Sequence, residues 1–211
     1  MENQLNPTLD TIASYNNFAQ SFAEQTRTVD NYPGLKTELD LFIKLLQGKK
    51  VLDVGFGSGR DTLYFQQHNL ATFSIELCAN FVKSFQNIVS SPIMLMDMRE
   101  LAFRQQYFDG IWTCASLLHI PKIDVPSVLN GFNRVLKDDG LLYVSVKEGS
   151  GEQWIEEGPI KSPRYFSHYF LDEISSLVSS HGFSIVKAQK QPIINSGRNW
   201  ISISARKIFT G

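Results

Sequence analysis

The amino-acid sequence predicts one α/β domain whose seven-stranded, mostly parallel sheet lies between two layers of helices. Strand-like apolar runs alternate with helical segments through the middle of the chain, which is typical of a doubly wound parallel sheet. Near the C-terminus, two strand-like runs lie too close together for a helical crossover, so we expect them to pair antiparallel. A length of 211 residues with 43% hydrophobic residues suits a single domain with a sizeable core.

The expected strands are short runs rich in β-branched, aromatic and other apolar residues. The first five are Lys50–Val54, Ala71–Glu76, Ile93–Met96, Phe108–Thr113 and Leu141–Val146. The antiparallel pair is Phe183–Ala188 and Trp200–Ala205, and Pro192 and Gly197 mark the loop between them.

Helices are expected where apolar residues recur at helical spacing. In the first, Ile12, Tyr15, Phe18 and Phe22 share one face. The expected helices are Thr11–Glu24, Leu35–Leu46, one that starts within Asp61–His68, Val125–Leu136 and Asp172–His181. We expect Asp124 to cap the fourth of these, and Asp139-Gly140 to form the turn before the fifth strand.

The most informative segment is the glycine-rich turn after the first strand. Gly55, Gly57 and Gly59 recur at every second position, just before a helix start. A strand, a glycine turn and a helix let the backbone approach a ligand closely. The dinucleotide fingerprint G-x-G-x-x-G requires a glycine at position 60, where this chain has Arg60. The spacing therefore counts against a nicotinamide oxidoreductase.

With Asp53 two residues before the first glycine, the pattern D-x-G-x-G-x-G resembles the first motif of class I S-adenosylmethionine (SAM) methyltransferases. The chain is most similar to the type 11/25 group that acts on small molecules, and the resemblance covers roughly Tyr15 to Lys207. It implies a Rossmann-like core at residues 48–211 and a helical lid at residues 1–47 of one domain. It also implies SAM as cofactor, S-adenosylhomocysteine as product and a small-molecule acceptor.

Ligands of doubly wound sheets bind beyond the carboxyl ends of the strands. There the resemblance implies that Asp53 and the turn meet the methionine part of SAM, Glu76 the ribose hydroxyls and Asp97 the adenine amino group. Asp53 as a cap of the turn, and Glu76 as an acid at a helix start, are the structural alternatives. The full expected cofactor set is Tyr15, Asp53, Gly55, Phe56, Gly57, Gly59, Arg60, Glu76, Leu77, Asp97, Met98 and Cys114.

For the acceptor, His119 is the best acid–base candidate, although a histidine in a loop also serves structural roles. The resemblance places Tyr15, Asn16 and Phe18 in a lid over the cofactor, with ordinary core packing as the alternative. The acceptor pocket is expected to include the linker at 148–169. Its aromatic residues and Arg164 suit a small, planar or anionic acceptor, and equally suit packing of a long connection.

The composition of the chain narrows the remaining classes of function. The net charge is −1, from 20 basic and 21 acidic residues, and no basic run exceeds Lys49–Lys50, which argues against a nucleic-acid partner. Cys78 and Cys114 lack metal-site spacing, so we expect no metal and two free thiols in the cytoplasm. The N-terminus lacks a signal-peptide pattern, and no apolar run suits a membrane span.

Several alternatives stay open at this point. A methyltransferase-like protein that binds SAM or its product without turnover has the same cofactor residues, and so does a protein methyltransferase. The sequence leaves open the oligomeric state, the identity of the acceptor, the choice among O-, N-, S- and C-methylation, and whether a general base is used.

Overall fold

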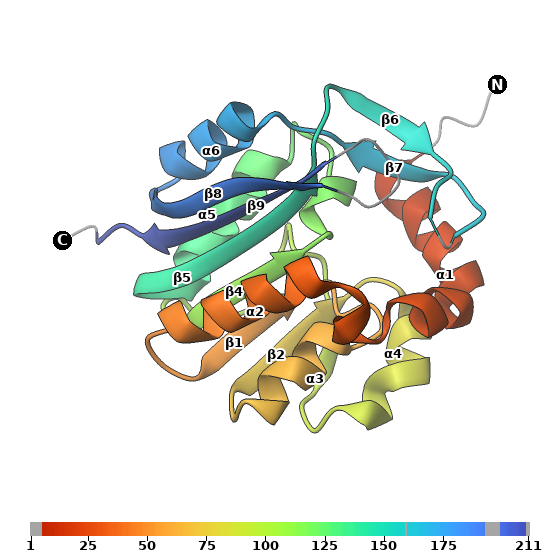
Figure 1. The fold of residues 1–211 in the computed structure, drawn as a ribbon, viewed down its shortest axis with the longest axis horizontal. Helices are drawn as coiled ribbons and strands as arrows, with labels where there is room; N and C mark the ends of the chain where they lie inside the picture. The colour runs from red at the N-terminus through yellow and green to blue at the C-terminus, as the bar shows by residue number, and fades with distance from the viewer. Residues whose placement is uncertain (1–5, 159, 193–198, 210–211) are drawn as a thin grey trace.

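The predicted fold is confirmed by the computed structural model, which describes residues 6–158, 160–192 and 199–209. Seven strands form one sheet in the order β3-β2-β1-β4-β5-β9-β8, with helices on both faces (Figure 1). The strands are β1 (Lys50–Val54), β2 (Ala71–Glu76), β3 (Ile93–Leu95), β4 (Phe108–Cys114), β5 (Leu136–Lys147), β8 (Phe183–Pro192) and β9 (Asn199–Lys207). The first five are parallel, and β9 pairs antiparallel with both β5 and β8.

Alternate residues of the central strands pack into separate cores on the two faces of the sheet. On one face, Val51 packs with side chains of α2 (Pro33–Leu45) and α3 (Arg60–Gln67). On the other, Leu52 belongs to the larger core with side chains of α5 (Val125–Val135) and α6 (Leu171–Ser180). This alternation follows from the two-residue period of a strand, and burial on both faces explains why the strands are nearly continuous apolar runs.

The carboxyl ends of the strands are covered by α1 and a hairpin. Helix α1 (Pro7–Thr26) contacts α4 (Ala79–Phe85), the short helix η3 (Leu117–His119) and strand β7 (Arg164–Ser167) (Figure 1). The hairpin consists of β6 (Glu152–Ile155) and β7 (Arg164–Ser167), which pair antiparallel. Two further short helices are η1 (Val29–Asn31) and η2 (Gln86–Ile88). The covering segments position the residues that the sequence assigned to the lid and the acceptor pocket.

Local structure departs from expectation at two acids. Asp124 precedes α5 but makes no side-chain cap; its carboxylate pairs with Arg99 at 3.2 Å. Asp139 does not end the unit in a turn, because β5 already begins at Leu136 and continues through it. Asp139 instead takes a left-handed φ of 58° where the β4–β5 register shifts, a conformation that aspartate tolerates better than most residues.

Smaller differences concern the ends of the elements. Helices α1 and α2 begin earlier than expected, β8 extends to Pro192, and the hairpin β6–β7 was not predicted within the linker. Gly197 lies outside the described residues.

Both cysteines are free thiols. In the described part of the chain, no helix is long and apolar enough to cross a membrane, and no cluster of metal-ligating side chains is found.

Candidate active site

The glycine turn uses its three glycines for two different purposes. All three have positive φ angles, of 91°, 52° and 78°. A Cβ at Gly55 would lie 2.6 Å from Cβ of Ser116, and one at Gly59 would lie 2.6 Å from the Phe56 ring. At Gly57 the nearest side-chain atom is on the Phe22 ring, 3.8 Å away. Packing within the protein therefore requires Gly55 and Gly59, whereas Gly57 faces Phe22 of α1 across a narrow gap that a Cβ would fill to van der Waals contact.

Glu76 connects this turn to the end of β2. Its Oε2 accepts a hydrogen bond from the Gly57 amide at 2.8 Å, and its Oε1 accepts from the amides of Leu77 and Cys78, both at 2.8 Å. Burial raises the pKa of Glu76, while the three amides oppose that shift. A carboxylate offers about four acceptor positions, so about one stays available for a ligand hydroxyl.

Asp53 lies inside the protein. Its side chain is only 2% exposed, and its Oδ2 accepts a hydrogen bond from the Thr62 hydroxyl of α3 at 2.5 Å. Burial, followed by the negative charge of Asp61, raises the pKa of Asp53. The hydrogen bond ties β1 to α3, which gives Asp53 a structural role other than the cap of the turn.

Arg60, the residue that breaks the dinucleotide fingerprint, also has internal partners. Its Nε donates to Asp61 at 2.7 Å, and its Nη1 donates to the Thr26 carbonyl oxygen at the end of α1 at 3.4 Å. The Sγ of Cys114 lies 4.0 Å from Nη2, and burial raises the pKa of this thiol. Arg60 thus ties the glycine turn to the C-terminal end of α1 and the end of β4.

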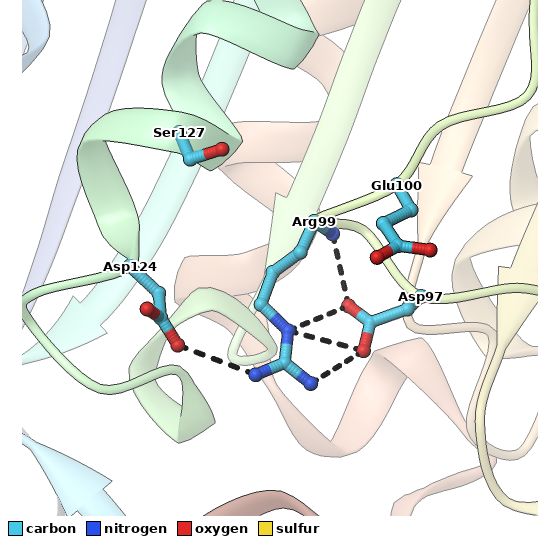
Figure 2. Close-up of a pocket in the computed structure, with 5 residues that line it drawn as sticks. All are labelled: Asp97, Arg99, Glu100, Asp124 and Ser127. Carbon is cyan, nitrogen blue, oxygen red and sulfur yellow. Dashed lines mark hydrogen bonds and ion pairs between the residues drawn. The ribbon is translucent and has the colours of Figure 1, made fainter.

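Asp97 follows β3 and is held by Arg99. The guanidinium and the backbone amide of Arg99 donate to both carboxylate oxygens at 2.6–3.1 Å. Figure 2 shows the Arg99 guanidinium between Asp97 and Asp124, beside a hollow of about 400 Å³ that Glu100 and Ser127 also line. Neither the glycine turn nor Glu76 lines this hollow. An adenine amino group would therefore compete with Arg99 for Asp97.

Other expected cofactor residues are divided between the lid and the core. Phe56, buried under the turn, belongs to a cluster with α1 and α4, and Leu77 contributes its amide to Glu76. Met98 is 9% exposed and its side chain belongs to the large core, as expected for a methionine that fills core space. The structure thus gives no support to contact between the Met98 side chain and a ligand.

An aromatic trio covers the glycine turn. The rings of Tyr15 and Phe22 in α1 and Phe81 in α4 lie 5.4–5.8 Å apart between centroids. Asn16 fixes the helix there, because its Oδ1 accepts a hydrogen bond from the Asn80 amide at 3.0 Å. Sequence reasoning named Tyr15 and Asn16 but missed Phe22 and Phe81 in this role. The helical period put Phe22 on the apolar face, yet nothing local indicated that Gly57 lies opposite.

Phe18, the third expected lid residue, marks a kink. Its φ of −123° and ψ of 16° are not helical, although the helix continues on both sides. The kink separates Tyr15, which reaches η3, from Phe22, which lies over the turn. Phe18 thus marks the bend between the two halves of α1.

His119 lies at the other end of Tyr15. Its Nδ1 is 2.7 Å from the Tyr165 carbonyl oxygen, which can only accept, so Nδ1 carries the proton. Nε2 is therefore an acceptor, and the Tyr15 hydroxyl, 2.8 Å away, donates to it. Burial lowers the pKa of His119 to about 3, and the positive charges of Arg164 and Lys147 act in the same direction. The imidazole is neutral and its tautomer is fixed.

Arg164 completes this network from β7. The side chain is 4% exposed, and its Nη1 donates to the Tyr15 hydroxyl at 3.2 Å. Nη2 donates to the Glu157 carbonyl oxygen. The guanidinium carbon lies 5.4 Å from the centroid of the Tyr15 ring and 5.1 Å from that of Phe166. The structure thus brings α1, the His119 loop and the linker at 148–169 together.

Known proteins share the fold and part of the sequence of this chain. Residues 52–144 match the family model of a methyltransferase domain. A search of curated protein sequences gave no significant match. The solved structures that share the fold include a SAM-dependent methyltransferase of Methanosarcina mazei, with a TM-score of 0.71 and 16% identity over 81% of this chain and 98% of that one.

Two further structures cover almost the whole chain. One is the Burkholderia thailandensis 1,6-didemethyltoxoflavin-N1-methyltransferase, solved with 1,6-didemethyltoxoflavin and S-adenosylhomocysteine. It is 20% identical, with a TM-score of 0.69, over 99% of this chain and 94% of that one. The other is a methyltransferase in a Haloferax volcanii complex with the Trm112 methyltransferase activator. It is 12% identical, with a TM-score of 0.73, over 95% of this chain and 99% of that one. At such identities the likeness shows the fold. Residues 52–144 thus match a methyltransferase domain, and the chain has the fold of class I SAM-dependent methyltransferases.

Proposed function

We propose that the protein transfers the methyl group of SAM to a small-molecule acceptor. In this proposal a single domain performs the transfer, with residues 1–47 as its lid. The observation that carries this proposal is the position of Tyr15. Its ring packs with Phe22 over the glycine turn, and its hydroxyl binds His119 at 2.8 Å. One lid residue thus lies between a nucleotide-type cradle and a polar, aromatic cluster.

We call Gly57, Glu76, Phe22 and Phe81 the cofactor side. When bound, SAM supplies a methyl group activated by a cationic sulfonium. The open acceptor position on Glu76 suits a ribose hydroxyl, and the donors around it fix the carboxylate. Gly57 leaves room beside the turn, while aromatic faces of the lid attract a cation and exclude water.

The remaining expected contacts are proposed with less direct roles. Gly55, Gly59, Phe56 and Arg60 shape the turn, and Leu77 holds Glu76. Asp97 would bind the adenine amino group only by sharing its oxygens with Arg99. Asp53 and Met98 are buried and support the site from within the core. Cys114 is protonated and adds a small side chain at the end of β4.

We call His119, Arg164, Phe166 and Lys147 the acceptor side. Positioning of a nucleophile supplies much of the acceleration of a displacement. When Tyr15 no longer donates to it, the neutral Nε2 of His119 accepts a hydrogen bond from the acceptor and orients it, while its lowered pKa opposes full transfer of the proton. A small acceptor is supported by the burial of Arg164 and Phe166 and by the Burkholderia neighbour, which was solved with a small-molecule substrate. The two free thiols support a cytoplasmic location.

A second candidate function is binding of SAM or its product without turnover. It is favoured by one observation: both ring nitrogens of His119 already have partners, Tyr15 and the Tyr165 carbonyl. Formation of S-adenosylhomocysteine from SAM in the presence of candidate acceptors separates the two functions, because a binding protein accumulates none.

Thermal melting with SAM, S-adenosylhomocysteine and NAD tests the cofactor first. A ligand at about 100 times its dissociation constant adds roughly 2.7 kcal/mol to stability, which raises the melting temperature of a chain of this size by several degrees. We expect a rise with SAM and its product, a smaller rise for Glu76→Gln, and none with NAD. No rise with SAM or S-adenosylhomocysteine would contradict the proposal.

A further inference from the structure

The acceptor side carries one positive charge more than its acids neutralise. Lys147, at the end of β5, forms an ion pair with Glu157. Arg164 has only neutral partners among the described residues: the Tyr15 hydroxyl, a backbone carbonyl and two aromatic rings. His119 is neutral, and burial raises the pKa of Tyr15, which keeps its hydroxyl protonated. The excess of one positive charge is therefore that of Arg164.

Arg164 also has a donor without an acceptor. Its Nε is buried and makes no hydrogen bond, although the side chain is only 4% exposed. A buried guanidinium that lacks both an acid and one hydrogen bond is costly, and a ligand that supplied them would recover that cost. Arginine is also the residue best suited to bind a carboxylate, because its donors match two oxygens.

The surroundings of Arg164 suit a ligand with a flat apolar part. Two cations flank the Phe166 ring, with Lys147 Nζ at 4.4 Å and the Arg164 guanidinium carbon at 5.1 Å from its centroid. The same ring lies 4.8 Å from the His119 ring. An organic anion there would lie beside the neutral Nε2 of His119 and, across Tyr15, close to the cofactor side.

From this geometry we propose that the acceptor is an organic monoanion, a planar or aromatic carboxylate, whose carboxylate binds Arg164. The inference rests on the methyltransferase function proposed above and names its substrate class. Anion binding and the cationic sulfonium favour one another, since the negative charge would lie between two positive ones. A purely structural Arg164, which only fixes the β6–β7 hairpin to α1, predicts no preference for anions.

The test is calorimetric titration of the whole chain, with and without S-adenosylhomocysteine. The probes are benzoate, phenylacetate, 4-hydroxybenzoate and indole-3-acetate, each against its own neutral amide. We expect at least one carboxylate to bind about tenfold or more tightly than its amide, as loss of a charge-assisted hydrogen bond implies. If S-adenosylhomocysteine binds and no carboxylate exceeds its amide, the acceptor class is wrong. If S-adenosylhomocysteine itself fails to bind, the methyltransferase function fails, and the acceptor role with it.

Variants locate the binding. Arg164→Gln should lower carboxylate affinity to that of the amide, and Arg164→Lys should keep part of the preference. Arg104→Gln is the matched control, because Arg104 is an exposed arginine that, within the described residues, stacks on Tyr107, and it should leave the preference unchanged. Equal loss in Arg104→Gln and Arg164→Gln would overturn the assignment to Arg164. The comparison of acid with amide in the unaltered protein decides the matter even if Arg164→Gln does not fold.

Discussion

On the cofactor side, the hydrogen bond that shapes the site joins Gly57 and Glu76, which are 19 residues apart in the chain. On the acceptor side, Tyr15 binds His119 across 104 residues and Arg164 across 149. The first side is built on backbone turns that follow two paired strands, with the rings of Phe22 and Phe81 beside them, whereas the second exists only when α1, η3 and the β6–β7 hairpin come together. We therefore expect the cofactor side to be set by backbone conformation and the acceptor side by side-chain contacts.

The largest expected effect comes from Gly57→Val. A side chain there would enter the gap between the turn and Phe22, and a φ of 52° strains a β-branched residue by about 1–2 kcal/mol. We expect the affinity for S-adenosylhomocysteine to fall by about a hundredfold, or roughly 2.7 kcal/mol, as measured by titration calorimetry.

Gly151→Val is the control for Gly57→Val. Gly151 has a φ of 71°, and a Cβ there would meet no atom within 4 Å. The control therefore bears similar backbone strain, in the loop before β6, without filling the gap. Equal affinities of Gly57→Val and the unaltered protein would show that the cofactor binds elsewhere.

The same division explains what the sequence predicted well. The bounds of β1 and β2 were predicted correctly, and so was the glycine turn between β1 and α3, because a buried strand followed by positive-φ glycines is a local pattern. The tertiary role of Asp53 was harder to predict: nothing local shows that Thr62 bonds to its carboxylate. The glycine turn was easier to predict than the contact of Asp53, because the turn depends on neighbouring residues whereas the contact depends on how α3 packs.

The acceptor side was predicted as a set of segments but not as contacts. The four-residue strands β6 and β7 are too short for a period-two pattern to distinguish them from loop, and β7 is what aligns Arg164 with Tyr15. Phe22 shows the same limit on the lid, because its partner Gly57 is set by the approach of α1 to the turn. Contacts between distant segments depend on complementarity that a single sequence does not display.

The two sides also respond to pH in opposite directions. His119 has a pKa of about 3 in the folded protein, against about 6.5 when unfolded. Between these values the unfolded chain binds a proton that folded His119 does not, so stability falls as the pH falls, by up to about 1.4 kcal/mol per pH unit. The raised pKa values of Asp53 and Glu76 mean that these acids take up protons on folding, which favours the folded state at low pH.

His119→Gln isolates the histidine contribution. Urea unfolding at pH 6.5, 5.5 and 4.5 should show a loss of stability that is steeper in the unaltered protein than in His119→Gln, by about 1 kcal/mol per pH unit. His68→Gln, at the exposed residue that follows α3, should keep the slope of the unaltered protein. Parallel slopes for the unaltered protein and His119→Gln would mean that His119 is accessible to water and protonates normally.

The smallest expected effect, from Tyr15→Phe, separates the two sides within one residue. The variant keeps the ring that packs with Phe22 and Phe81 but removes the hydroxyl that donates to His119 and accepts from Arg164. We expect a loss of about 1 kcal/mol in the free energy of unfolding, with affinity for S-adenosylhomocysteine nearly unchanged. Tyr32→Phe, which removes an exposed hydroxyl bonded to the Gln25 carbonyl, should change neither quantity. If Tyr15→Phe weakened cofactor binding as strongly as Gly57→Val, the hydroxyl would belong to the cofactor side, and the two sides would act as one cooperative unit joined through α1.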